Sequence, residues 1–219
     1  MPGTGDIRSF MESNTEIIAP PLVPEIRLRL ATEITPIWQA TEDELDTAGL
    51  PPPFWAFCWP GGQAVARYLL DTPDTVRGRR VLDFAAGGGV CSIAAALAGA
   101  AHVTANDIDG FALTAVRLNA ALNGVEVEVL ADDLLLADRA GEFDVVLAGD
   151  IFYERSPAVE IEAFLRRCAA GGATVLLGDP GRKYLPQSGL ERLAGYDIPT
   201  SLELETKEIS TGRVWRVLP

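Results

Sequence analysis

Acidic side chains follow several apolar segments of this 219-residue chain, each at a point where a strand is predicted to end. Asp83 and Asp107 each close such a segment, Asp132 and Asp133 follow another, and Asp150 comes after a further one. In an open sheet of parallel strands the carboxyl ends share one edge, and ligands bind in the crevice outside it. A single acid could cap a helix instead, but acids after four strands together indicate a ligand site at this edge.

A glycine-rich turn follows Asp83 and limits the ligand that this edge would hold. Gly87, Gly88 and Gly89 stand between an apolar run and an alanine-rich helix, where the backbone can approach a nucleotide-type ligand closely, although such turns also serve tight packing alone. For a nicotinamide dinucleotide, Ser92 replaces the third glycine of the fingerprint, and the Asp83 carboxylate would repel a pyrophosphate. The same carboxylate suits the ammonium and sulfonium groups of S-adenosylmethionine, so the sequence favours this methyl donor.

Other residues would complete the donor site. Asp107 is placed to accept both hydrogen bonds of a ribose diol. Either Asp132 or Asp133 could accept a hydrogen bond from the adenine amino group, and the sequence does not separate them. The aromatic run Phe54–Trp59 precedes a predicted helix, and Trp59 is either a wall for the ligand or part of a core corner.

Composition indicates one globular α/β domain, since 48% of the residues are hydrophobic and 22% are charged. The formal net charge of −13 would repel nucleic acid and anionic lipid and attract a lysine-rich target, although acidity also serves solubility alone. No apolar stretch is long enough to span a membrane, and the N-terminus lacks the basic start of a secretory signal. We expect a cytoplasmic monomer without a metal site, whose three cysteines are reduced core thiols.

The order of the predicted elements indicates the fold class. From Arg80 onward strands and helices alternate and the strands are continuously apolar, which predicts a doubly wound, mostly parallel α/β sheet with helices on both faces. A weak helix is predicted near Leu190, an edge strand or hairpin at Glu203–Glu208 and a last strand at Val214–Leu218. The only histidine, His102, begins a strand, away from the carboxyl edge, so we do not expect it to act in catalysis.

Residues 1–53 form an N-terminal extension that we expect to pack on the core. A helix is predicted over Asp6–Ile18, an extended segment over Leu22–Leu30, and a capping-box pattern occurs at Thr41–Glu44. The ligand-binding domain is predicted to span residues 54–219.

Several segments together resemble the seven-strand S-adenosylmethionine-dependent methyltransferases, in the subgroup with an Asp-x-x-Tyr signature after the fourth strand. Most members of this subgroup methylate protein lysines. The segments are Asp150–Tyr153 above all, then Val81–Gly89 and Asn106–Asp109. Within the subgroup, Phe54–Leu70 and Gly178–Arg182 are similar to the family that methylates lysines of the electron transfer flavoprotein β subunit. The resemblance runs from about residue 54 to the end of the chain and implies a Rossmann-like methyltransferase domain.

The resemblance implies methyl transfer from S-adenosylmethionine to lysine side chains of a protein, with the flavoprotein β subunit as the expected partner. Asp150 would accept a hydrogen bond from the lysine amine, Tyr153 would wall the lysine channel, and Arg182 would contact the backbone or an acidic patch of the target. The residues expected to hold the donor are Trp59, Asp83, Ala85, Gly87, Gly89, Asp107, Ile108, Asp132, Asp133 and Gly149.

Two departures and several alternatives accompany this interpretation. Ala85 stands where the family usually has glycine, and no mitochondrial targeting segment is evident, which indicates a bacterial-type cytoplasmic form. Alternatives are methylation of another protein, such as a ribosomal protein, or of a small molecule, a non-enzymatic donor-binding module, and a nicotinamide oxidoreductase. Adenine methylation in nucleic acid is disfavoured because Asp150–Tyr153 contains no proline to press on a flipped base.

Overall fold

The structure is a computed structural model that describes residues 4–32, 52–137, 139, 141–200 and 209–219. The patterns predicted at Thr41–Glu44 and at Glu203–Glu208 lie outside the described residues.

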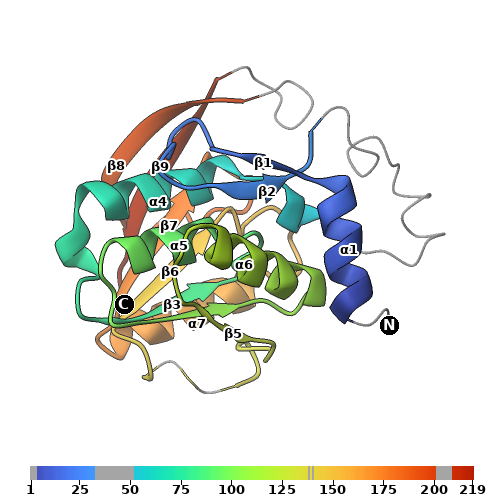
Figure 1. The fold of residues 1–219 in the computed structure, drawn as a ribbon. Coiled ribbons are helices and arrows are strands. Elements are labelled where there is room, and N and C mark those ends of the chain that lie inside the picture. Colours follow the sequence, from blue (N-terminus) through green and yellow to red (C-terminus); the bar gives the residue numbers. More distant parts are fainter. Residues whose placement is uncertain (1–3, 33–51, 138, 140, 201–208) are drawn as a thin grey trace.

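A seven-stranded sheet forms the centre of the molecule, with strand order β5-β4-β3-β6-β7-β9-β8 (Figure 1). The first five strands in this order are parallel, and β9 runs antiparallel to both β7 and β8. The predicted doubly wound, mostly parallel sheet is confirmed. The chain leaves β3 toward β4 on one side and reaches β6 on the other, so the switch point of the topology lies between β3 and β6. The strands are β3 (Arg80–Phe84), β4 (His102–Asn106), β5 (Glu128–Leu130), β6 (Val145–Gly149), β7 (Thr174–Asp179), β8 (Leu190–Pro199) and β9 (Ile209–Val217).

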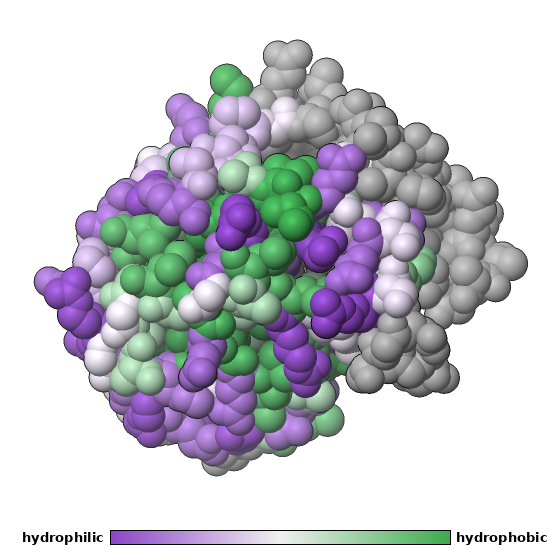
Figure 2. Space-filling view, viewed as in Figure 1, coloured by the Kyte–Doolittle hydropathy of each residue, from purple (hydrophilic) through white to green (hydrophobic). Residues whose placement is uncertain are grey.

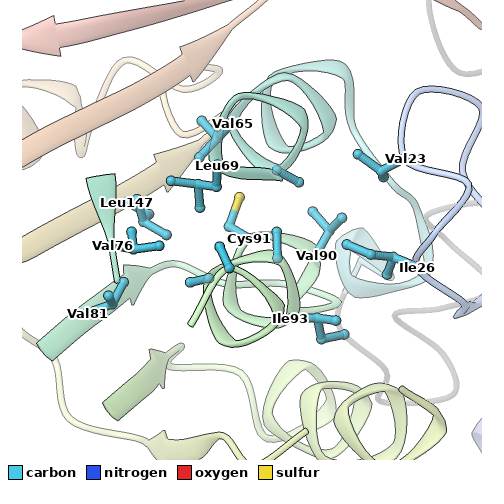
Figure 3. Packing of buried hydrophobic residues seen from close by; sticks show 14 of the residues in the cluster. Val23, Ile26, Val65, Leu69, Val76, Val81, Val90, Cys91, Ile93 and Leu147 are labelled. Carbon is cyan, nitrogen blue, oxygen red and sulfur yellow. The ribbon is translucent and has the colours of Figure 1, made fainter. Parts of the chain in front are cut away.

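Helices cover both faces of the sheet. On one face lie α4 (Pro60–Asp71), α5 (Val90–Leu97) and α6 (Gly110–Leu122), and on the other lies α7 (Ala158–Ala170) (Figure 1). Because side chains alternate along a strand, neighbouring apolar residues serve different cores. Figure 3 shows the core on the side of the sheet that α4 and α5 cover. Here Val81 and Leu147 of the strands pack with Val65 and Leu69 of α4 and with Cys91 of α5.

The opposite face holds a second core against α7. Leu82 and Val146, each next in sequence to a residue of the first core, are buried there with Phe164 and Leu165 of α7. The continuous apolar strands of the sequence are thus explained, since a parallel sheet covered on both faces buries side chains that point to either face, as in Val81–Phe84 of β3.

The N-terminal segment packs beside α6. It consists of α1 (Thr4–Asn14) and a two-stranded sheet of β1 (Glu16–Ile18) and β2 (Leu28–Leu30). The helix predicted up to Ile18 is therefore wrong after Asn14, because the β-branched pair at its end instead pairs with β2, with Ile18 opposite Leu28. The side chains of Ile7, Met11, Trp55 and Phe111 form a third buried cluster between this segment and α6.

The helix predicted near Leu190 is also wrong, because this segment is the edge strand β8. Its residues pair along the whole length of β9, from Leu190 opposite Val217 to Pro199 opposite Ile209. The last strand therefore begins at Ile209 and not at Val214. Pairing with a distant strand has overridden the weak local preference.

Polar and apolar side chains are interspersed on the surface shown in Figure 2. Within the described ranges, no helix is long and apolar enough to cross a membrane, and no three His, Cys, Asp or Glu side chains are placed to hold a metal ion. The three cysteines are free thiols, with Cys91 and Cys168 buried and Cys58 half-buried.

Candidate active site

A cleft opens at the carboxyl edge of the sheet, beside the switch point between β3 and β6. It contains about 430 Å³ of empty space, part of it open to solvent. Three segments far apart in the sequence form its walls: the short helix η1 (Phe54–Ala56) with the start of α4, the glycine turn after β3, and the end of β6. The lining residues are Phe54, Phe57, Cys58, Trp59, Gly62, Asp83, Ala85, Ala86, Gly87, Gly88, Val90, Cys91, Gly149 and Asp150.

The glycine turn bends by left-handed backbone conformations. Gly87 and Gly89 have φ angles of 53° and 82°, and Gly89 is the N-cap of α5. Ala85 also adopts a positive φ of 53°, a conformation that costs a residue with a Cβ roughly 1–2 kcal/mol. The alanine that stands where the family usually has glycine is therefore locally strained, and the surrounding hydrogen bonds hold it in place. One of these is the bond from the Ala86 amide to the Asn106 carbonyl, 2.9 Å long.

Asp83 lies at the floor of the cleft with only 2% of its surface exposed. Its Oδ2 atom accepts two hydrogen bonds from Ser92, one from the backbone amide at 2.8 Å and one from the hydroxyl at 2.6 Å. Burial raises the pKa of Asp83 to about 7, and the bonds from Ser92 oppose this shift. Ser92, considered only as a missing glycine in the sequence, is thus the residue that positions this carboxylate.

Asp107 follows β4 and holds the glycine turn. Its Oδ2 accepts a hydrogen bond from the Gly87 amide at 2.9 Å, and its Oδ1 accepts one from the Asp109 amide at 3.0 Å. Burial raises the pKa of Asp107, while these backbone bonds lower it. Asp107 and Asp150 therefore lie at the same edge, after β4 and β6, as the sequence predicted. The contact with a ribose remains a prediction.

Asp132, Asp133 and Ile108 lie on the surface, outside the residues that line the cleft. Ile108 is 77% exposed, and Asp133 accepts a hydrogen bond from the Leu135 amide, as a turn residue does. The adenine contact assigned to either aspartate stays a prediction. The loop that carries them is fixed by Asn106, whose buried side-chain amide donates to the Leu130 and Asp132 carbonyls at 3.0 and 2.8 Å.

Asp150 is the most constrained residue of the cleft. It is 6% exposed and has a positive φ of 56°. Its Oδ2 accepts a hydrogen bond from the Gly62 amide at the start of α4, at 3.0 Å, and its Oδ1 accepts one from Arg182 Nη2 at 2.9 Å. Burial raises the pKa of Asp150 to about 7, and the Arg182 charge lowers it. The sequence did not reveal either partner, and Arg182, expected to face the target, points inward to Asp150.

Aromatic side chains form the outer wall. The Trp59 indole N–H donates to the Phe54 carbonyl at 3.0 Å, so Trp59 is fixed within the lining. Tyr153 is 49% exposed, and its ring centre lies 5.3 Å from that of Phe54. This places Tyr153 at the rim beside the cleft, where its predicted role as a wall for a lysine chain remains a prediction.

His102 lies at the start of β4, remote from the carboxyl ends of the strands, and its Nε2 contacts Glu128 Oε2 at 2.8 Å. It therefore has no place in the cleft chemistry.

Comparison with known proteins identifies the family. A family model described as ribosomal protein L11 methyltransferase (PrmA) matches residues 67–154. The electron transfer flavoprotein beta subunit lysine methyltransferase of Rattus norvegicus is 39% identical over 219 residues, covering 97% of this chain and 85% of the rat protein. That of Danio rerio is 40% identical over 217 residues, covering 96% of this chain and 83% of its own length. The chain belongs to this family of lysine methyltransferases.

Among solved structures, magnesium protoporphyrin IX methyltransferase (ChlM) from Synechocystis PCC 6803, with bound SAH, shares the fold. The TM-score is 0.52 at 18% sequence identity, covering 73% of this chain and 84% of that one. The domain therefore has the Rossmann-like methyltransferase fold.

Proposed function

We propose that this protein transfers a methyl group from S-adenosylmethionine to lysine side chains of the electron transfer flavoprotein β subunit. The relatives that match nearly the whole chain carry this activity in their names. The observation that carries the proposal is that the cleft joins the glycine turn to Asp150 in one cavity. A donor held by the turn and an amine held by Asp150 would then meet between β3 and β6.

The donor would bind along the glycine turn. Gly87, with its positive φ, and Gly88 bring the backbone to the cavity without side chains in the way, whereas Gly89, the N-cap of α5, lies outside the lining and faces Val116. Asp83 in the cleft lining would supply a carboxylate for the donor's ammonium, Trp59 would pack beside the donor, and Gly149 leaves room at the end of β6. Asp107, which lies outside the lining but holds the Gly87 amide, would supply a carboxylate for the ribose. The donor supplies an electrophilic methyl group on a sulfonium.

The acceptor must arrive as a neutral amine, in line with the methyl–sulfur bond. The nitrogen lone pair would form the new nitrogen–carbon bond while the sulfur–carbon bond breaks, and the electron pair of the broken bond would stay on sulfur. The proton of the resulting ammonium passes to solvent. Asp150 would accept an amine hydrogen bond and orient the lone pair, while Phe54 and Tyr153 would flank the lysine chain.

Purified protein, isotopically labelled S-adenosylmethionine and the flavoprotein β subunit test this proposal. Intact-mass spectrometry should show methyl increments on the subunit, and peptide mapping should place them on lysines. Ribosomal protein L11, added to the same reaction as a competitor, should stay unlabelled. Labelling of L11 alone, or of neither protein, would contradict the proposed substrate.

We also propose that the protein is cytoplasmic and acts as a monomer. Light scattering after size-exclusion chromatography should give the mass of one chain, and a mass of two chains would contradict this.

A further inference from the structure

Asp150, which is buried, forms an ion pair with Arg182, which is half-buried. The side chains are 6% and 21% exposed, and Nη2 of the arginine lies 2.9 Å from Oδ1 of the aspartate. The other oxygen accepts the Gly62 amide hydrogen bond. The carboxylate therefore cannot rotate without losing a bond. Removing charges from water costs about as much free energy as their Coulombic attraction returns, so the pair fixes the carboxylate without adding much stability.

The loop after β7 fixes Arg182 in this position. Its backbone amide and that of Gly181 both donate to Asp179 Oδ1, at 2.7 and 2.6 Å. Asp179 is fully buried, and Arg213 donates to the neighbouring Pro180 carbonyl at 3.1 Å. These hydrogen bonds fix the backbone from which the Arg182 side chain extends.

The same guanidinium also contacts the cleft wall. Its central carbon lies 5.6 Å from the ring centre of Trp59, within the range of a cation–π interaction. Arg182 therefore connects the acid at the end of β6 to the indole at the start of α4.

We propose that Arg182 is a positioning residue for methyl transfer, which orients the Asp150 carboxylate and balances its charge. Asp150 then accepts a hydrogen bond from the neutral substrate amine and does not hold the lysine in its charged ammonium form. This inference rests on the proposed function. An isolated buried carboxylate would stabilise the ammonium form of lysine, which has no lone pair to attack the methyl group. Paired with a guanidinium, the carboxylate is part of a neutral unit, and its oxygens keep further lone pairs as acceptors.

The groups around Asp150 support this role for Arg182. Asp179 at the end of β7 raises the pKa of Asp150, and Arg182 is the cation that lowers it. The thiols of Cys58 and Cys91 face Asp150 from the cleft wall and from α5, and burial, with a smaller effect of the Asp150 charge, raises the pKa of each. The thiols are therefore uncharged and cannot balance the negative charge of the Asp150 carboxylate. Removing the guanidinium charge would therefore favour the protonated carboxyl and the charged lysine.

The test is the pH profile of kcat for Arg182→Gln, with Arg182→Lys and Arg80→Gln for comparison. Arg80 forms an ion pair with Asp144 at 2.8 Å at the opposite ends of the strands, so its variant removes the same charge elsewhere. For R182Q we expect the acidic limb to move to higher pH by about one unit, because a nearby cation lowers a carboxyl pKa by that order. R182K should restore most of this shift, and R80Q should match the wild type. A rate lowered equally at every pH in R182Q would overturn the proposal.

Carboxyl carbon NMR of aspartate-labelled protein separates this inference from the choice of substrate. The Asp150 signal, assigned by its loss in Asp150→Asn, should titrate at higher pH in R182Q than in the wild type. If the flavoprotein subunit is not methylated, the proposed substrate fails, but the NMR titration still decides the role of Arg182. An unchanged Asp150 titration in R182Q overturns it.

Discussion

Asp83 and Asp150 are two buried carboxylates of one cleft, and their partners differ in charge. Asp83 is held by Ser92, which is neutral, whereas Asp150 is held by Arg182. Burial raises both pKa values to about 7. Each group can therefore change its protonation near neutral pH, and each makes stability depend on pH. In the proposed reaction Asp83 acts on the donor, whereas Asp150 acts on the acceptor.

Asp83→Asn should make stability less dependent on pH. The folded protein keeps a proton on Asp83 up to about pH 7, whereas the ordinary pKa is 3.8, so stability falls as pH rises between these values. The asparagine oxygen can still accept both Ser92 bonds, but its amide does not titrate. Urea unfolding should show a slope shallower by up to about 1.4 kcal/mol per pH unit between about pH 4 and 7. Asp74→Asn, at a side chain 90% exposed, is the control and should keep the wild-type slope.

Asp150→Asn should lower kcat about 100-fold, which is the order of loss expected when a reacting group is no longer held in line. An amide has one acceptor oxygen where the carboxylate has two, and no charge to pair with Arg182. Donor affinity, measured by calorimetry, should change only a few-fold, because the donor contacts are assigned to the glycine turn. Asp144→Asn, at the amino ends of the strands, should retain kcat. Wild-type turnover in D150N would remove Asp150 from the mechanism.

At the scale of elements, the site depends on how closely α4 approaches the ends of β6 and β7. Gly61 and Gly178 face each other, and a Cβ on Gly178 would overlap the Gly61 carbonyl oxygen. A Cβ on Gly61 would in turn meet Asp150 Oδ2. Asp150 satisfies an amide at the N-terminus of α4, which has no capping side chain of its own. The position of α4 and the position of the Asp150 carboxylate therefore depend on each other.

Gly178→Ala should destabilise the protein by about 1–3 kcal/mol, because the new methyl group forces the backbone of α4 away from the sheet. Methyl transfer should fall as well, since Asp150 loses its alignment with Gly62. Gly110→Ala is the matched control: a Cβ there meets no atom within 4 Å, and alanine suits the start of a helix. Equal denaturation midpoints for the two variants would show that the close approach is unimportant.

At the scale of the whole molecule, Asn119 links the N-terminal segment to the donor cleft. Its side chain is fully buried in α6. Its oxygen accepts the Arg29 amide at 2.8 Å, and its nitrogen donates to the Gly88 carbonyl at 2.9 Å. The position of β2 and the position of the glycine turn are therefore connected through one amide.

Asn119→Ala should cost about 2 kcal/mol of unfolding free energy, because the Arg29 amide and the Gly88 carbonyl, which are both half-buried, lose their partner. It should also weaken binding of S-adenosylmethionine, since Gly88 is no longer held. Chemical denaturation and calorimetry measure the two effects. Gln187→Ala, which removes an exposed amide bonded to the Leu185 carbonyl, is the control. Loss of stability with unchanged donor affinity would confine Asn119 to a structural role.

The sequence alone was sufficient to predict the features that depend on residues close together in the chain. The strand, glycine turn and helix around Asp83 follow from local hydrophobicity and glycine positions, and acids after parallel strands must share an edge. Local pattern was insufficient at Leu190, where pairing with β9 made a strand, and at Ile17 and Ile18, where pairing with β2 ended a helix.

Tertiary structure alone decided the partners of Asp150. Gly62 is 88 residues away from it in the sequence and Arg182 is 32 away. Local patterns do not specify which distant backbone amide or guanidinium will meet a carboxylate, because that depends on how α4 and the loop after β7 pack against β6. The charge balance at Asp150 arises from this packing, whereas the presence of an acid at that edge was already determined by the order of strands.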